Sequence, residues 1–312
     1  MKIAFRGKKI LVMLENMGEY KMKTEDIRAL IGIPVILLIA GLLVWAGNQG
    51  GLLAFGLPIF GLCVTLAFLI QWVVFIPAYV FQTEKFFDLT GSLTYLSVTT
   101  FAFLLSGAAN ARAWLLLVLV SIWALRLGTF LFTRVQKSGK DSRFDDIKPS
   151  LPRFLLTWTL QGLWVSFTLA AALAAITSRL RIPLDIFAAL GLLVWALGFS
   201  IEVIADWQKS RFRSDPRNKG HFIRSGLWSW SRHPNYFGEI VLWTGVAIIT
   251  LPVLHGWQWL TMISPVFIFI LLTRISGIPM LEKKADEKWS GQADYEAYKA
   301  NTSILVPHPP RK

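Results

Sequence analysis

The sequence of 312 residues contains a single cysteine and few charged residues. Only 16% of the residues are Asp, Glu, Lys or Arg, whereas a soluble domain carries about 25%. Cys63 lies within an apolar run, and we interpret it as a small core residue. This composition excludes an internal disulfide framework and argues against an ordinary soluble domain.

Two common kinds of site are also missing from the sequence. The four histidines (positions 221, 233, 255 and 308) and the lone cysteine lack metal-ligand spacing, so no metal site is predicted. No Gly-x-Gly-x-x-Gly segment follows a strand pattern, which excludes a Rossmann domain. The net charge of +13 could suggest nucleic acid, but the basic residues are distributed over many loops, so no nucleic-acid partner is expected.

Long apolar runs dominate the chain instead, and 54% of its residues are hydrophobic. Because a helical crossing of the bilayer needs roughly 20 mostly apolar residues, the sequence predicts an all-α integral membrane protein of about eight transmembrane helices, with seven as the alternative. The candidate spans are 29–47, 57–80, 92–107, 114–134, 157–177, 184–205, 237–254 and 257–275. They form one polytopic domain (29–275) between a basic arm (1–28) and a charged tail (276–312).

The basic residues are sorted by loop. If all eight stretches cross the membrane, one side carries 26 Lys and Arg residues and the other carries 3. The positive-inside rule then places both termini in the cytoplasm. We expect a multi-pass protein of a bacterial inner membrane that contacts membrane lipids. The oligomeric state is left open.

A polar stripe follows the sixth apolar stretch. Glu202, Asp206, Lys209 and Arg213 are spaced by 4, 3 and 4 residues, which places them on one face of a helix. Acidic residues near membrane depth are retained where they face a bundle interior or a wet cavity. The alternative is a set of salt bridges between these acids and the basic residues that follow.

A second polar segment opens the seventh stretch. Pro234 suits the first turn of a helix, with Ser231 or His233 near the cap. Free amides beside Arg232 and His233 would form an anion site, and Asn235, four residues before Glu239, would share its face. Alternatively, Arg232 is a topology charge and His233 a satisfied interfacial imidazole.

These motifs carry a family resemblance. The run Ser231 to Glu239, the segment Asp206 to Arg213 and the earlier Lys85 to Gly91 resemble a bacterial membrane family first named as a domain of unknown function. That family is related to the C-terminal domain of steroid 5α-reductases, and the resemblance covers about residues 57 to 307. In the wider superfamily, which includes sterol reductases, the half with the first two motifs holds NADPH and the N-terminal half supplies the lipid pocket and proton donor.

The resemblance implies which residues contact the cofactor: Asp206, Lys209, Arg213, Arg232, His233, Asn235, Tyr236 and Glu239. We add Glu202 to this predicted cofactor site because it belongs to the same stripe. The charge of the loop also favours an NADPH site. Seven basic residues from Lys209 to Arg232 supply the positive field that a pyrophosphate and a 2′-phosphate need.

The predicted catalytic residues are Asp88, Tyr95 and Arg126. The chain lacks the Gln-Glu pair of 5α-reductases, and Asp88 is its nearest counterpart, with Tyr95 two turns along the same helical face. Asp88 could instead cap its helix. Arg126 lies inside an apolar stretch and needs an acidic partner, for which Asp88 and Glu202 are the candidates.

The leading hypothesis is therefore a membrane-embedded, NADPH-dependent reductase of a C=C bond in a lipid or steroid-like enone, an oxidoreductase acting on CH-CH groups. An S-adenosylmethionine-dependent methyltransferase of the isoprenylcysteine type is the alternative. Those enzymes share an Arg-His-Pro-x-Tyr-x-Gly segment and have a Glu followed by Tyr in the tail, as Glu282 and Tyr295 are here. A non-enzymatic transporter or scaffold is the third possibility.

Overall fold

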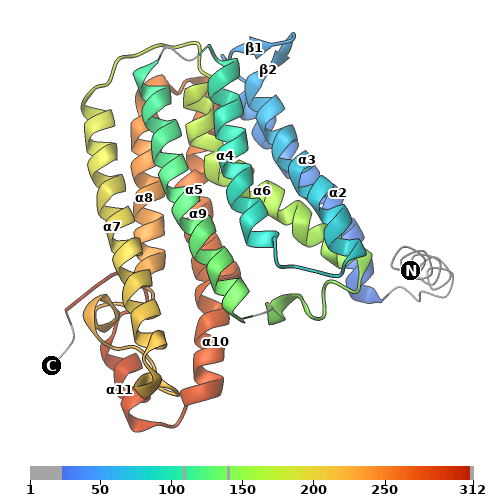
Figure 1. Ribbon diagram of the computed structural model, residues 1–312. Coiled ribbons are helices and arrows are strands. Elements are labelled where there is room, and N and C mark those ends of the chain that lie inside the picture. Colours follow the sequence, from blue (N-terminus) through green and yellow to red (C-terminus); the bar gives the residue numbers. More distant parts are fainter. Residues whose placement is uncertain (1–22, 108–109, 139–140, 310–312) are drawn as a thin grey trace.

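The computed structural model describes residues 23–107, 110–138 and 141–309 and shows a bundle of long helices (Figure 1). Most of the predicted basic arm therefore lies outside the described residues. The fold is all-α and contains no Rossmann domain, as the sequence predicts. The long helices are α2 (Thr24–Gly47), α3 (Ile59–Val80), α4 (Phe87–Leu105), α5 (Ala111–Ser138), α6 (Leu151–Ile176), α7 (Ile186–Ser214) and α8 (Pro234–Thr250).

Shorter elements complete the described chain. Strands β1 (Leu53–Ala54) and β2 (Leu57–Pro58) form a small hairpin between α2 and α3. Helical turns η4 (Leu251–Val253), η5 (Gly256–Met262), α9 (Ile263–Ile270) and the π-helical η6 (Leu271–Ile275) form the last apolar segment. The tail forms α10 (Ile278–Trp289) and α11 (Ala293–Asn301), and the loops contain η1 (Ser142–Phe144), η2 (Pro216–Asn218) and η3 (Gly226–Ser229).

Seven of the described helices are long and apolar enough to cross a membrane. The predicted span 92–107 corresponds to α4, which lies beside α5 in the bundle (Figure 1) but is not among the seven. Helix α4 contains four threonines and two serines, which lower its apolar character. The other seven predicted spans match the seven long apolar helices, so the protein is a multi-pass membrane protein.

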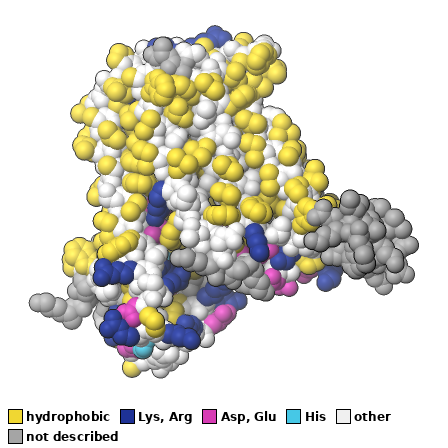
Figure 2. Space-filling view, viewed as in Figure 1, with side chains coloured by type: hydrophobic (Ala, Val, Ile, Leu, Met, Phe, Trp, Pro, Cys, Tyr) yellow, Lys and Arg dark blue, Asp and Glu magenta, His cyan; other side chains and the backbone are white. Residues whose placement is uncertain are grey.

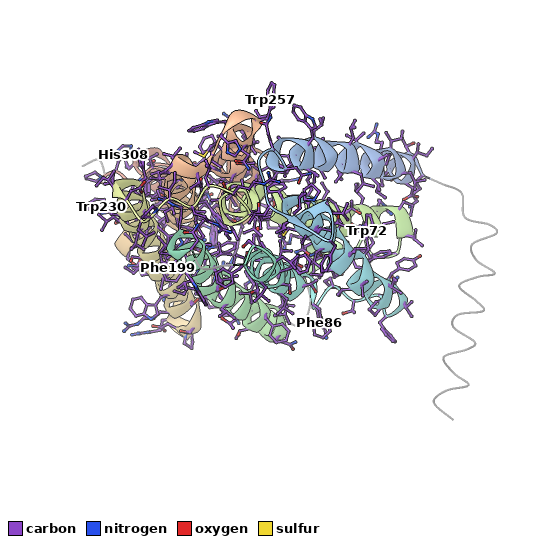
Figure 3. All side chains as sticks on the ribbon, turned by 90° about the horizontal axis from the view of Figure 1, so that it is seen from above. Trp72, Phe86, Phe199, Trp230, Trp257 and His308 are labelled. Carbon is purple, nitrogen blue, oxygen red and sulfur yellow. The ribbon has the colours of Figure 1, made fainter. Side chains whose placement is uncertain are left out.

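The surface of the bundle fits a bilayer. On the face seen in Figure 2, hydrophobic side chains form a broad belt, and charged side chains gather at the end that carries α10 and α11, which we call the tail end. Trp257 and Phe86 are about half exposed and lie on opposite edges of the bundle seen along its axis (Figure 3). Exposed apolar side chains of this kind are expected where a protein faces lipid.

Helix α6 lies at the centre, since 83% of its apolar window is buried. Fully buried Trp158, Leu169 and Leu173 anchor it in the core. At the end opposite the tail, buried Arg112 pairs with Asp185 at 3.1 Å and donates to the carbonyls of Pro183 and Ile249. One side chain of α5 thereby ties the start of α7 to the end of α8.

Glycines bring α7 and α8 into close contact. Gly191 and Gly198 on α7 face Gly245 and Gly238 on α8, and a Cβ atom built on any of the four would meet the facing backbone at 2.4–2.6 Å. Small residues allow such close approach of membrane helices. This contact fixes the register of the two helices that carry both polar motifs.

We expect Gly198→Ala to destabilise the protein by about 1–3 kcal/mol, because overpacking forces the two backbones apart. Gly41→Ala is the matched control, since a Cβ atom at Gly41 in α2 meets nothing within 4 Å. Thermal unfolding in detergent measures both. Equal melting temperatures for the two variants would contradict the close packing of α7 on α8.

Candidate active site

Arg126 is the centre of the polar site inside the bundle. Its two terminal nitrogens, presented by α5, form ion pairs with Glu202 and with Asp206 on α7. Both carboxylates are more than nine-tenths buried. The prediction that Glu202 pairs with Arg126 is confirmed. The other candidate partner of Arg126, Asp88, is wrong. The alternative pairing of these acids with the basic residues that follow is also wrong, because Arg126 comes from another helix.

The start of α8 adjoins this ion-pair cluster. Asn235 donates from Nδ2 to Oδ1 of Asp206 at 3.2 Å, so the two polar motifs meet. Glu239, one turn further along α8, interacts electrostatically with Arg126 and Asp206 but forms no hydrogen bond or ion pair with any described residue. The structure thus brings Arg126, Glu202, Asp206, Asn235 and Glu239 together.

Tyr95 lies in an aromatic cluster next to this site. Its ring contacts Trp123 edge-on at 5.0 Å between centroids and lies 6.1 Å from the ring of Trp243. The indole nitrogens of both tryptophans are buried and have no hydrogen-bond partner within the described part of the chain, and the buried Tyr95 hydroxyl interacts with the side chain of Thr168 on α6. Unpartnered buried donors are costly in a fold, so they mark a place that could receive an acceptor.

Asp88 lies apart from Tyr95. It occupies the first turn of α4 and forms an ion pair of 3.7 Å with Arg134. The helix N-cap is Phe86, and no side-chain cap bond forms, so the capping alternative is wrong. Seven residues of α-helix rise about 10 Å, which prevents the two side chains from meeting one small group. The catalytic role of Asp88 stays a prediction.

A pocket of about 350 Å³ opens at the tail end of the bundle, between the end of α7, the loop before α8, and α10 and α11. Glu282 is the one carboxylate among the described residues that line it. Its walls also include Trp228, Trp289, Tyr295 and Tyr298. The cationic residues of the lining are Lys209, Arg213, Arg232, Lys284 and Lys288, together with His221 and His233.

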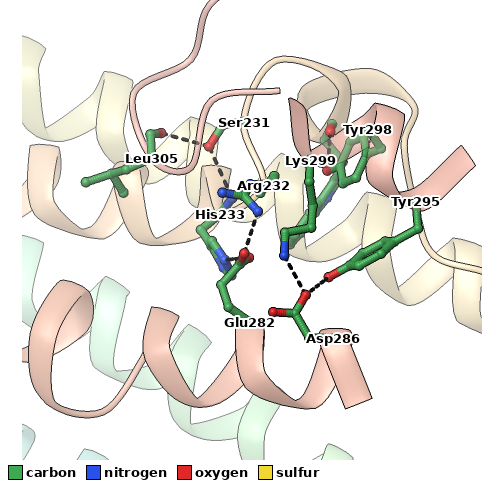
Figure 4. A network of polar contacts seen from close by, with 10 residues as sticks. Ser231, Arg232, His233, Glu282, Asp286, Tyr295, Tyr298, Lys299 and Leu305 are labelled. Carbon is green, nitrogen blue, oxygen red and sulfur yellow. Dashed lines mark hydrogen bonds and ion pairs between the residues drawn. The ribbon is translucent and has the colours of Figure 1, made fainter. Parts of the chain in front are cut away.

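The Arg-His-Pro segment is held by the tail. Glu282 of α10 forms an ion pair with Arg232 and accepts a hydrogen bond of 2.8 Å from Nε2 of His233 (Figure 4). Helix α8 begins at Pro234 with His233 as its N-cap, as predicted. A carboxylate from a distant segment of the chain thus engages both residues, and the anion site stays a prediction. Tyr236 stacks on His233 at 5.7 Å between ring centroids.

The chain beyond α11 returns to the same segment. The backbone N–H of Arg232 donates to the carbonyl of Ser303 at 2.8 Å. The Ser231 hydroxyl donates to the carbonyl of Leu305 at 2.7 Å (Figure 4). On α11, Tyr298 donates to the carbonyl of Trp228 at 2.7 Å. The sequence reasoning treated this tail as a charged extension. The aromatic residues in it, at 289, 295 and 298, are the signal that could have indicated a folded wall of the pocket.

The histidine of this network predicts a pH dependence. Burial lowers the pKa of His233 below its usual value of about 6.5, although the hydrogen bond with Glu282 opposes this shift. The folded protein therefore binds fewer protons at His233 than the unfolded chain, and stability falls as the pH drops below about 6.5. In His233→Gln this loss should be smaller. Melting temperatures measured between pH 8 and 5 test it, and an unchanged slope in the variant would refute it.

The geometry defines an all-α membrane protein with a polar interior site and a basic pocket at one end. Comparison with known proteins identifies the family of the chain. A family model described as "Protein of unknown function (DUF1295)" matches residues 74–302, and the chain belongs to this family. The family lies in the membrane group of steroid 5α-reductase-like proteins and methyltransferases, in agreement with the resemblance.

One curated relative gives a more distant similarity. The chain is 30% identical over 70 residues to "Probable O-methyltransferase ustE" of Ustilaginoidea virens. This segment covers 22% of the chain and 25% of the relative's length. No solved structure matches the chain. The comparisons therefore indicate a membrane enzyme family.

Proposed function

We propose that the protein is an NADPH-dependent reductase of a C=C bond in a lipid or steroid-like enone. The observation that carries the proposal is the charge of the tail-end pocket, which has five Lys or Arg side chains and one carboxylate in its described lining. That carboxylate, Glu282, is already paired with Arg232. The pocket is thus suited to a ligand with several negative charges, such as a dinucleotide with a 2′-phosphate.

Two of the cations lack a salt-bridge partner among the described residues, although the charge of Asp206 acts on Lys209. Lys209 is half-buried and lies 4.2 Å above the Trp228 ring, and Arg213 follows one turn later on α7. Neither forms a salt bridge with any residue that the structure describes. Lys209 is thus a partly buried cation without a salt bridge, which an anionic ligand would stabilise, and Arg213 is an exposed cation next to it. Phosphate oxygens would do so here.

The donor set fits the cofactor. Lys209, Arg213 and Lys284 would hold its phosphates, and the aromatic walls at 228, 289 and 295 would contact a planar base. A pocket of about 350 Å³ is at the small end for ligand sites, so it would hold one end of a dinucleotide. Asp206, whose charge acts on Lys209 of the pocket, and its hydrogen-bond partner Asn235 belong to the interior site and would contact the remainder. When bound, the cofactor supplies hydride, and the protein orients it and excludes water.

A second candidate function is methyl transfer from S-adenosylmethionine. It is favoured by the name of the curated relative and by the pairing of Glu282 with the Arg-His-Pro segment. The net charge of the pocket opposes it, because the sulfonium of that cofactor is itself cationic. A reductase therefore accounts better for the lining.

Thermal-shift measurements in detergent with NADPH, NADH and S-adenosylmethionine test the proposal. A ligand that binds only the folded protein stabilises it by RT ln(1 + [L]/Kd), about 2.7 kcal/mol at 100 times Kd. We expect NADPH to stabilise most and NADH less. Stabilisation by S-adenosylmethionine alone would replace the reductase with the methyltransferase.

Lys209→Met should weaken NADPH binding by about 10- to 100-fold, since a hydrogen bond to a charged group contributes about 1.5–3 kcal/mol. The matched control is Lys283→Met, because Lys283 is 79% exposed on α10 and does not line the pocket. Isothermal titration in detergent gives both dissociation constants. Equal affinities of the two variants would remove Lys209 from the cofactor site.

A further inference from the structure

The hairpin between α2 and α3 has a strained, apolar turn. Strands β1 and β2 are antiparallel, and the two-residue loop between them is Phe55-Gly56. Both residues have a positive φ, +55° for Phe55 and +77° for Gly56. Positive φ at both positions is typical of a type I′ turn, in which Asn-Gly or Asp-Gly is the favoured pair. A phenylalanine is unfavourable there, because its Cβ crowds the backbone.

The Phe55 side chain receives no packing from the protein in return. It is 88% exposed, more than any other large hydrophobic side chain among the described residues. Leu53 and Leu57, on either side of the turn, are each 54% exposed. The whole connector from 48 to 58 contains no charged residue. An apolar residue at a position that favours asparagine indicates that the turn lies in an apolar environment outside the protein.

The base of the hairpin is fixed to the bundle. The backbone N–H of Leu52 donates to the carbonyl of Thr177 at 2.8 Å, and that of Ile59 donates to the carbonyl of Leu52 at 3.0 Å. Arg179 donates from Nε to the carbonyl of Gly51 at 3.1 Å. The position of the turn is therefore set by the end of α6, the central helix.

The surroundings of the hairpin resemble the edge of a bilayer. It lies beside the upper end of α3, at the end of the bundle opposite the tail end (Figure 1). Trp45 in the last turn of α2 and Trp257 at the start of η5 are more than half exposed, with ring centroids 5.2 Å apart. Tryptophan is enriched where membrane proteins cross the interface between lipid and water.

Two exposed arginines follow α6 at the same end. Arg179 and Arg181 donate to the backbone carbonyls of Gly51 and Ser106, and neither forms an ion pair with a carboxylate of the described residues. Long basic side chains near helix ends direct their charge toward the interface, and guanidinium groups bind phosphate. Their remaining N–H groups are thus suited to lipid phosphates above the apolar turn.

We propose that the β1–β2 hairpin is an interfacial anchor, in which Phe55 inserts into the phospholipids of the leaflet opposite the tail end, at the boundary of headgroups and acyl chains. The partner is a phospholipid because apolar tip, tryptophans and exposed arginines occur together, as the layers of a bilayer edge require. Burial of the Phe55 ring in lipid offsets the cost of its positive φ. This anchor does not depend on the reductase function.

Fluorine NMR in nanodiscs of phosphatidylcholine and phosphatidylglycerol tests the anchor. The probe is para-trifluoromethylphenylalanine at position 55, which keeps the aromatic ring. We expect a lipid nitroxide near the headgroup to broaden its signal more than a nitroxide near the chain end or a soluble gadolinium chelate. The same probe in place of Leu38, 66% exposed within α2, is the control for the acyl chains. The probe in place of Lys219, exposed in the loop after α7, is the control for water.

The controls define the results that would overturn the proposal. Broadening at position 55 by the gadolinium chelate alone, as at position 219, would place the turn in water. A signal at position 55 that neither the lipid nitroxides nor the chelate broaden would mean that protein covers the turn, for example a second copy of the chain.

Phe55→Asn provides a second measurement through the sign of its effect. Asparagine is favoured in a type I′ turn, so it would raise the melting temperature in nanodiscs if the Phe55 ring faced water. With the ring in lipid, the substitution also removes the burial of an apolar side chain. We therefore expect a melting temperature no higher than that of the wild type. Phe55→Trp, which keeps an interfacial aromatic ring, is the matched control and should melt like the wild type. A raised melting temperature of Phe55→Asn would contradict the anchor.

Discussion

Arg126→Met should destabilise the protein by about 3–5 kcal/mol, the largest stability effect that we expect of any single substitution. The substitution keeps the bulk of the side chain but removes the cation that Glu202 and Asp206 share. Removing one partner of a buried pair leaves an uncompensated charge, and that residual charge accounts for most of the cost. Here two carboxylates, both more than nine-tenths buried, lose their partner at once.

Titration with a denaturing detergent in mixed micelles measures the free energy of unfolding of this variant. Arg134→Met is the matched control, because Arg134 is 48% exposed and its ion pair with Asp88 is long at 3.7 Å. Exposed pairs of this kind contribute about 1 kcal/mol or less. The triple variant Arg126→Met, Glu202→Gln, Asp206→Asn should recover much of the loss, since it removes the charges together. If the triple variant recovers no stability, the loss in Arg126→Met is caused by packing and not by the unpaired charges.

The membrane fold could be predicted well from the sequence, for a physical reason. A crossing needs about 20 apolar residues whatever its neighbours are, so seven of the predicted spans reappear as long apolar helices. Helix α4 is the marginal case, because it is rich in threonine and serine, and three of its threonines donate their hydroxyls to backbone carbonyls one turn earlier. The start of α8 at Pro234 was also predictable, since proline suits a first turn.

The partners within the site were less predictable because they depend on which helices pack together. The spacing of Glu202 and Asp206 indicated a shared face, but not that both would reach Arg126 on α5. Glu282 lies in the tail, 50 residues from Arg232 along the chain, and only tertiary contact brings it to that residue. The helical face shared by Asp88 and Tyr95 was a correct local inference, yet the axial rise of α4 separates them.

The same geometry explains why substitutions in the two parts of the site should affect different properties of the protein. The cationic pocket at the tail end is lined by α7, α10 and the loop before α8, whereas Tyr95 and its tryptophans come from α4, α5 and α8. A substitution in the pocket should therefore act on cofactor affinity. A substitution in the aromatic cluster should act on turnover.

Tyr95→Phe should lower kcat by about 10²- to 10⁴-fold while it leaves the protein about as stable as the wild type. The phenol oxygen is buried and interacts with the side chain of Thr168, but this contact does not have the geometry of a good hydrogen bond, so removing the hydroxyl should cost little stability. The ring contacts with Trp123 and Trp243 remain. If the hydroxyl donates a proton in the transition state, kcat and kcat/KM should fall together, and NADPH affinity should stay close to that of the wild type.

Tyr79→Phe is the matched control, because Tyr79 lies near the end of α3 and stacks on Phe75, away from both parts of the site. It should keep wild-type turnover. Melting temperature, NADPH affinity and turnover with an enone distinguish the possibilities for Tyr95→Phe. A purely structural tyrosine would give a lower melting temperature and retained turnover, and that result would remove Tyr95 from the chemistry. A stable variant with wild-type NADPH affinity and slow turnover would leave proton donation as the function of its hydroxyl, which is the one group that the substitution removes.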